Sequence, residues 1–388
     1  FILAAVNLPV SQRIITGKAN DFFSSRELPV SVEKISLLVT GRVGLRHPQI
    51  TGSSGDTLLY ADQISIAVRI TPLLFKKLKI RAATINNATV ALTRDSVTGK
   101  IDLISLFSSG SRPAEDKAGT GSKWQIEAES VTLKNVRFSY DDERGGLKVW
   151  QSVGRLFVKL DRLSLQDKSI DIVEVDLESV FGGVELGNQR TAKEPMAEKK
   201  PSPWNFSLGK GDLKEIRFVL HQPGKKQQMN FSVDRGEISD AGLGLSGHTI
   251  TVNGIDLQAP VVSMFSSDTE ANRGKDPAKK SGTGFPGPWN IEGGKINISK
   301  GAFHRGDYAD LAMTSDTLPS SQVSDLSVVL NDVILNTKES DINIGRLSFI
   351  LGNGFELAKG EIAFHSDSSM NSRFEASLST SSSRAKVS

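Results

Sequence analysis

A phrase that opens on tryptophan and closes on phenylalanine fourteen residues later occurs three times in this chain. The copies read WQIEAESVTLKNVRF from Trp124, WNFSLGKGDLKEIRF from Trp204 and WNIEGGKINISKGAF from Trp289. Matched positions are Leu133, Leu213 and Ile298, then Val136, Ile216 and Gly301, then Phe138, Phe218 and Phe303. A recurring apolar pattern predicts a repeated supersecondary unit that leans on its neighbours.

A second phrase follows each opening phrase. It reads IDIVEVDL from Ile170, ITVNGIDL from Ile250 and FELAKGEI from Phe355. The first two copies begin 46 residues after their tryptophans (170 − 124 and 250 − 204), whereas the third begins after 66 (355 − 289), which indicates an insertion. A fainter copy, LKIRAATI, begins at Leu78 without a preceding tryptophan. The chain therefore reads as four β units, of which the first is divergent.

Strand-like alternation dominates the units. ADQISIAVRI, GRLFVKLDRLSL and HTITVNGIDL each place apolar residues at every second position, which is typical of strands with one dry and one wet face. The alternation skips a residue between Leu160 and Leu163 and between Val252 and Ile255, which predicts bulges that bend the sheet. We expect an all-β fold of elongated, curved, mainly antiparallel repeats.

One helix is expected near the N-terminus, from about Pro9 to Ser24. Pro9 suits a first helical turn, and Asn7 can cap it. Val10, Ile14 and Phe22 fall near one helical face, with Ile15 and Phe23 beside them. The segment is predicted to be a short amphipathic helix.

Three polar segments separate the repeats. Residues 109–123, 188–203 and 267–288 are rich in Gly, Pro, Ser, Lys and Glu, and we expect flexible loops there. The expected organisation is an anchor end and helix (1–27), a divergent repeat (28–108), a second repeat (124–187), a third repeat (204–266) and a fourth repeat with a tail (289–388).

Composition narrows the function classes. The chain has 388 residues, no cysteine and a net charge of +3, so no disulfide framework or cysteine metal site is possible and nucleic acid is not an expected partner. Residues 1–100 hold 13 Lys and Arg against 6 Asp and Glu, a net of +7 (13 − 6). The densest run, FKKLKIR from Phe75, reads either as the wet face of a strand or as a surface attracted to anionic lipid headgroups.

The candidate catalytic motifs are weak. GLGLSG from Gly242 matches a dinucleotide fingerprint, but a strand-like run follows it where that site needs a helix. The five histidines lack close ligand spacing, and DDERGG from Asp141 reads as a hairpin turn. We therefore expect no enzyme, no catalytic residue, no cofactor and no metal site.

The dry face of the repeats is the candidate functional surface, because a sheet with one apolar face must cover it with something. A second sheet of the same protein would give a filled sandwich, whereas a strongly curved sheet would leave an open groove suited to acyl chains. The groove candidates are Leu133, Val136, Phe138, Ile170, Ile172, Val175, Leu177, Leu213, Ile216, Phe218, Ile250, Val252, Ile255, Leu257, Ile298 and Phe303.

The chain opens with FILAAV, which reads either as the end of a membrane helix or signal segment or as a buried strand. This stub is followed by NLPVSQRIITGKANDFFSSRE and then by GDTLLYADQISIAVRITPLLFKKLKIRAATINNATVALTR. Together with FSYDDERGG from Phe138, these stretches resemble the N-terminal region of the TamB family of Gram-negative envelopes, within the AsmA-like group. The resemblance covers most of residues 1–180.

The resemblance implies a single inner-membrane helix ending at FILAAV and a periplasmic body shaped as a β-taco with a continuous hydrophobic groove. It implies phospholipid as the ligand, carried toward the outer membrane, and a TamA-like barrel engaged through a C-terminal region absent here. The alternative is a scaffold or chaperone for assembly of outer-membrane β-barrels. A third class, an adhesin with filled sandwich repeats, also fits the residues.

Overall fold

The computed structural model describes residues 9–387 apart from 26–27, 39, 53–54, 74–76, 95–100, 103–124, 143–144, 165–166, 188–201, 268–288, 310–321, 337–338 and 368–370. The chain divides into two compact units, Phe1–Ala192 and Lys193–Ser388. FILAAV, Trp124 and most of the three polar segments predicted as flexible loops lie outside the described residues.

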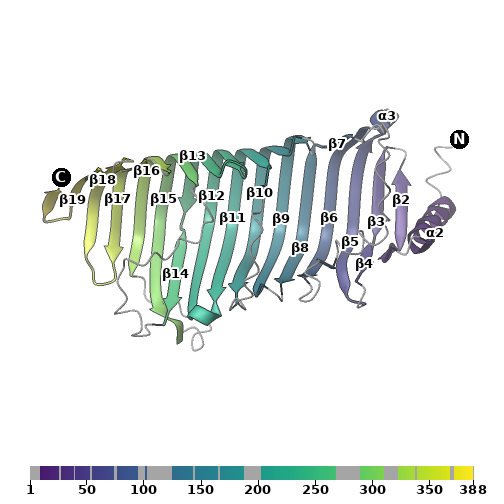
Figure 1. The fold of residues 1–388 in the computed structure, drawn as a ribbon, viewed down its shortest axis with the longest axis horizontal. Helices are drawn as coiled ribbons and strands as arrows, with labels where there is room; N and C mark the ends of the chain where they lie inside the picture. Colours follow the sequence, from purple (N-terminus) through teal and green to yellow (C-terminus); the bar gives the residue numbers. More distant parts are fainter. Residues whose placement is uncertain are drawn as a thin grey trace. The chain divides into compact units, whose positions relative to one another are not determined.

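Unit 1 contains two helices and ten strands among its described residues (Figure 1). They are α2 (Pro9–Ser25), β1 (Val30–Ser31), β2 (Lys34–Leu38), β3 (Arg42–Arg46), β4 (Gln49–Thr51), β5 (Thr57–Arg69), α3 (Ile70–Leu73), β6 (Lys77–Arg94), β7 (Gln125–Ala128), β8 (Ser130–Asp142), β9 (Leu147–Ser164) and β10 (Ser169–Leu186).

The strands of unit 1 pair in the order β2, β3, β5, β6, β7 with β8, β9 and β10, and the short pair β1 and β4 adds beside β5. Neighbours run antiparallel except where β6 pairs parallel with β7 and β8. The parallel pair marks the passage from one repeat to the next, because parallel neighbours need a crossover connection rather than a hairpin.

Unit 2 follows the same plan. Its elements are β11 (Asn205–Gln222), η1 (Pro223–Lys225), β12 (Gln227–Gly244), β13 (Thr249–Gln258), β14 (Val261–Ser266), β15 (Asn290–Asp307), β16 (Val323–Leu335), β17 (Ser340–Leu351), β18 (Glu356–Ser366), β19 (Ser372–Ser379) and β20 (Arg384–Val387). They pair in chain order, with β13 and β14 sharing one place between β12 and β15, and only these two pair parallel, with β15.

The prediction of an all-β, mainly antiparallel fold with one short N-terminal helix is confirmed, and the helix ends one residue beyond the predicted Ser24. The insertion in the fourth repeat also has a structural form. When β7 and β8, which pair one after the other with β6, are counted as one strand, the second phrase lies in the third strand after its tryptophan in β10 and β13. Phe355 instead immediately precedes β18, the fourth strand after Trp289. One additional strand therefore accounts for most of the longer spacing.

The repeated phrases share a backbone feature. The position eleven residues after each tryptophan is Asn135, Glu215 or Lys300, and all three have left-handed backbone, with φ of 53°, 55° and 54°. Nine residues after its start, the second phrase has the same conformation in three copies, at Asn87, Ser179 and Ala259, with φ of 50°, 53° and 51°, whereas Phe364 in the copy from Phe355 does not have it. The ladders keep their register on both sides of all of these residues except Lys300, so a left-handed residue interrupts and bends the strand there without an inserted residue. The repeats therefore encode a bend at matched places.

The predicted apolar face of α2 is not the face that packs. Val10, Ile14 and Phe22 are 66%, 55% and 51% exposed, whereas Gln12 and Thr16 are buried. The helix lies beside β2 (Figure 1) and contacts both β1 and β2. Its packed side is a polar stripe of Gln12, Thr16 and Asn20. The amphipathic pattern located the helix correctly, but it does not identify the packed side.

This polar stripe caps the edge of the sheet. Among the described residues β2 pairs with β3 alone, so its outer backbone groups need other partners. Thr16 Oγ1 accepts a hydrogen bond from the Ile35 N–H at 2.8 Å. The Asn20 amide accepts from the Val32 N–H at 3.1 Å and donates to the Val32 carbonyl at 3.0 Å. Two helix side chains thereby replace a missing neighbouring strand.

The DDERGG motif, predicted as a hairpin turn, and the GLGLSG motif each lie where two antiparallel strands connect. DDERGG connects β8 to β9, and Asp142 Oδ1 accepts the Gly145 N–H at 2.9 Å. In GLGLSG, Gly242 and Gly244 end β12 and Gly247 lies in the turn before β13, so no helix follows the glycines. The helix N-terminus that a dinucleotide site requires is therefore missing at this motif.

Candidate functional site

The pairing register gathers the apolar residues of unit 1 on one face, because paired residues of neighbouring strands point to the same side of a sheet. One row across the strands runs Ile64, Ile85, Leu133, Leu156 and Leu177. The next row, beyond the left-handed residues Asn87, Asn135 and Ser179, runs Ala61, Ala88, Val136, Val153 and Val180. We call this side the apolar face of unit 1.

Unit 2 has an equivalent apolar face. One row runs Leu213, Gly236, Leu257, Ile298, Val328 and Leu347. A second row runs Phe206, Leu243, Ile250, Ile291 and Leu335. The rows cross both antiparallel and parallel neighbours without a change of face, so the apolar face of unit 2 extends from β11 to β17.

The opposite side of each unit is mainly polar. In unit 1 its rows include Lys134, Arg155 and Glu178, and in unit 2 they include Lys214 and Arg235. Trp150 interrupts it in unit 1, because its indole covers Gly183, where an added Cβ would lie 2.3 Å from the ring. We call these sides the polar faces.

All sixteen groove candidates lie on the two apolar faces. Seven are in unit 1, at Leu133, Val136, Phe138, Ile170, Ile172, Val175 and Leu177. Nine are in unit 2, at Leu213, Ile216, Phe218, Ile250, Val252, Ile255, Leu257, Ile298 and Phe303. Gln151, which pairs with Phe138, is a polar interruption that the sequence pattern did not indicate. The structure establishes the common face, and lipid contact at these residues stays a prediction.

The apolar faces keep large side chains accessible. Leu186 in unit 1 is 39% exposed, and Phe218, Met264 and Phe374 in unit 2 are 38%, 47% and 48% exposed. Every described strand of a unit belongs to the ladder of that unit, so the described residues supply no second sheet as cover. A filled sandwich core would bury side chains of this size.

A row of small residues on the apolar face of unit 1 is nevertheless buried. This row lies directly beyond the left-handed residues. Its buried members are Ala61, Ala88, Val153 and Val180, which are 0%, 5%, 8% and 6% exposed. Larger neighbours from the two halves of the strands must converge over this row, as a bend toward the apolar face produces. The burial therefore marks the line along which the sheet of unit 1 folds.

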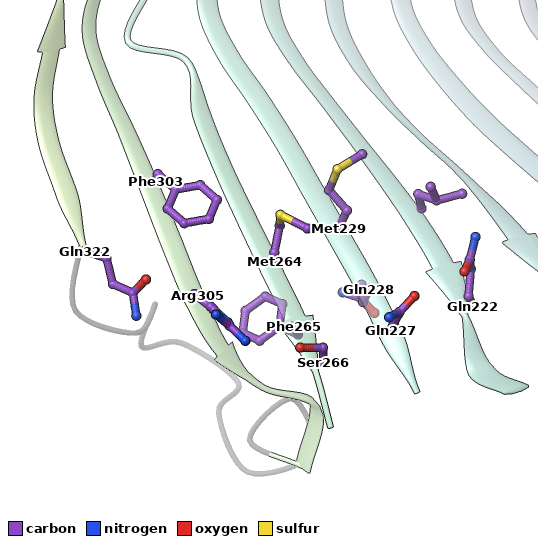
Figure 2. Close-up of a pocket in the computed structure, with 11 residues that line it drawn as sticks. Gln222, Gln227, Gln228, Met229, Met264, Phe265, Ser266, Phe303, Arg305 and Gln322 are labelled. Carbon is purple, nitrogen blue, oxygen red and sulfur yellow. The ribbon is translucent and has the colours of Figure 1, made fainter. Parts of the chain in front are cut away.

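A pocket of about 450 Å³ lies in unit 2 where β11, β14 and β15 end and β12 begins (Figure 2). Leu220, Met229, Met264 and Phe303 supply its apolar side, and Arg305 is its single charged residue. The remaining lining residues are Gln222, Gln227, Gln228, Phe265, Ser266 and Gln322. Sequence reasoning identified Phe303 but missed the polar members, whose signal was a change from apolar to amide side chains at the strand ends.

A hydrogen-bonded cluster lies on unit 1 around Asp62. The Asn87 amide donates to Asp62 Oδ2 at 2.8 Å and the Tyr60 hydroxyl donates to Oδ1 at 3.0 Å, and these bonds lower the pKa of Asp62. The bond to Asp62 is also the main reason that the pKa of Tyr60 is raised. A hydrogen bond from His47 lowers the pKa of Glu33. The cluster joins the left-handed residue Asn87 of β6 to Asp62 of β5, and we assign it a structural role.

One group in unit 2 combines metal-ligand residue types. Ligand atoms of Glu339, Asp341 and His365 lie within 4.8 Å of one another, and His365 Nδ1 lies 3.4 Å from Asp341 Oδ2. His365 is exposed and the two carboxylates are half-buried. A surface group of this kind is also what an ordinary ion pair between strands produces, so it does not by itself define a metal site.

No protein-family model matches the chain, and no curated protein matches it. Among the described residues, no helix has both the length and the apolar character needed to cross a bilayer. The functional interpretation therefore rests on the two apolar faces and the pocket.

Proposed function

We propose that the chain binds phospholipid, with the acyl chains lying against the apolar faces of its two units. The observation that carries the proposal is an extended apolar face with accessible Phe, Met and Leu side chains and no covering layer among the described residues. Exposed apolar surfaces of this extent are uncommon on soluble proteins unless they bind something. The proposal assigns the chain a binding role and no catalytic step.

Acyl chains suit this surface in shape and energy. Strands such as β11 and β12 have 18 residues each, so the apolar face of unit 2 extends about 60 Å along the strand direction. Burial of each CH₂ contributes about 0.8 kcal/mol, so an acyl chain of about 14 carbons gains on the order of 11 kcal/mol before binding costs. The strand backbones are paired in the ladders, so lipid on the face leaves no backbone group unsatisfied.

The resemblance to the TamB family extends the proposal to a cellular setting. It suggests a periplasmic body anchored in the inner membrane, which conducts phospholipid toward the outer membrane and engages a TamA-like barrel. These features depend on the resemblance alone. The lipid-binding proposal stands on the apolar faces and can be tested without them.

A pair of adjacent substitutions tests lipid binding. Val252 lies on the apolar face, paired with Ala241 and Gly293, and its exposed neighbour Thr251 lies on the polar face. We expect Val252→Asp to fold and to retain at least tenfold less phospholipid than the parent, because a carboxylate in the acyl path costs more than 1.4 kcal/mol. Thr251→Asp should retain lipid at the parental level.

The measurement is mass spectrometry of phospholipid retained by the purified chain, with circular dichroism as the folding control. Retention of lipid by a folded Val252→Asp variant at the parental level contradicts the proposal. An unfolded variant together with a lipid-free parent would instead indicate a self-filled core, in which a buried charge disrupts packing.

A further inference from the structure

The pocket in unit 2 lies where the apolar face becomes polar. Three successive rows on this face change in character toward the strand ends. They are Phe218, Phe231, Val262 and Phe303, then Leu220, Met229, Met264 and Arg305, then Gln222, Gln227, Ser266 and Asp307. Aromatic side chains thus give way to Leu and Met with one cation, and then to amides, a hydroxyl and the carboxylate of Asp307. This is the polarity order of a lipid from acyl chain to headgroup.

Arg305 holds the central position in this transition. It is paired with Met264 across β14 and β15, so its side chain emerges on the apolar face rather than on the polar face where cations normally lie. The residue is exposed, and it is the single charged residue among those that line the pocket. Asp307, one row further, does not line the pocket, and its carboxylate accepts the Ala309 N–H at 2.9 Å.

The wall behind the pocket is held in place from the polar face. His221 Nε2 and the Tyr308 hydroxyl lie 2.6 Å apart, and their rings stack with centroids 6.0 Å apart. This contact joins β11 to the segment after β15, although β12 and β14 lie between them. Phe265, which lies in the same polar-face row as His221, is 5% exposed. The strand ends that form the pocket are therefore braced against one another.

We propose that this pocket binds the phosphate of a phospholipid headgroup through Arg305, while the first acyl carbons lie on Met229, Met264 and Phe303. A guanidinium forms two parallel hydrogen bonds with a phosphate, and amide groups such as those of Gln222 and Gln227 can donate further hydrogen bonds. Figure 2 shows Phe303, Met264 and Met229 along one side of the lining and most polar members along the other, with Phe265 between Arg305 and Ser266. This inference rests on the proposed function and adds to it a preferred place and orientation for the headgroup.

The test compares three soluble probes by titration calorimetry: dihexanoylphosphatidylglycerol, dihexanoylglycerol and inorganic phosphate. We expect Arg305→Gln to weaken phosphatidylglycerol binding about tenfold, because it removes a charged hydrogen-bond donor, and to leave dihexanoylglycerol binding unchanged. Arg305→Lys should keep part of the affinity, because lysine keeps the charge but loses the paired donors. Arg235→Gln, on the exposed polar face of β12, is the matched control and should have no effect.

Each other outcome overturns a distinct statement. If both lipids bind the parent and Arg305→Gln binds phosphatidylglycerol as tightly as the parent does, the headgroup site is wrong and acyl binding stands. If inorganic phosphate binds as tightly as phosphatidylglycerol, the pocket is a site for free phosphate rather than for a lipid. If neither lipid binds the folded parent, the proposed function itself is wrong, and the headgroup site with it.

Discussion

The six left-handed residues at matched positions of the repeats have the backbone conformation that glycine adopts most easily, yet none of them is glycine. Asn87, Asn135 and Ser179 are short and polar, which lowers the cost of left-handed backbone, but Lys300 and Glu215 have no such advantage. These side chains persist because the ladders on either side fix the backbone between them. The local strain is the cost of bending the strands at the same place in each repeat.

A substitution at Lys300 tests this strain. Its φ is 54° and its side chain is exposed, so a β-branched replacement should act through the backbone rather than through lost contacts. We expect Lys300→Val to lower the free energy of unfolding by about 1–2 kcal/mol. Lys295→Val, at an exposed position in the same strand without positive φ, should change it by less than about 0.5 kcal/mol. Urea denaturation followed by circular dichroism gives both values, and equal losses would show that the bulge is not strained.

At the scale of single elements, α2 protects an edge rather than covering a core. Its contacts to β1 and β2 run through Thr16 and Asn20, whose side chains bond the free backbone groups of Ile35 and Val32. An unprotected edge strand is a template for pairing with another chain. The polar stripe of the helix therefore carries the packing role that the apolar stripe carries in most amphipathic helices.

Asn20→Ala removes two of these hydrogen bonds at once. We expect a loss of about 1–2 kcal/mol in the free energy of unfolding and faster hydrogen exchange at the Val32 amide, which loses its acceptor. Val10 lies on the other face of the same helix and is 66% exposed, so Val10→Ser should leave both the free energy of unfolding and the exchange rate unchanged. A larger loss from Val10→Ser than from Asn20→Ala would mean that the apolar face of the helix packs on the protein.

The comparison of these elements with their sequence shows what a single chain reveals. Alternation and the repeated phrases predicted the strands, and the offset between Leu160 and Leu163 predicted the register shift between β9 and β10, because both signals are local. The offset between Val252 and Ile255 is not accompanied by a register shift between β12 and β13, so the bulge predicted there is absent. The packed face of α2 was not predictable, since Thr16 and Asn20 bond the backbone of residues 12 to 19 positions away. The pocket was also not predictable, because pairing alone brings Leu220, Met264 and Arg305 together.

At the scale of the whole chain, both units share two features: apolar rows on one face and left-handed residues at matched positions in the repeats. In unit 2 that face leads to a pocket with a cation at the strand ends. The apolar faces have no cover among the described residues, which favours an open lipid surface over a sandwich core. The central claim is therefore that side chains on one face meet lipid and that their immediate neighbours do not.

Site-specific photocrosslinking in cells tests this claim most directly. A photoreactive amino acid would be placed in turn at Ile250, Val252 and Leu257 on the apolar face, and at Thr251 and Asp256 on the polar face of β13. We expect phospholipid adducts, detected by mass spectrometry, at the first three positions and none at the other two, because side chains alternate along a strand. Adducts of equal yield on both faces, or none at Val252 in a folded chain, would contradict lipid binding on the apolar face.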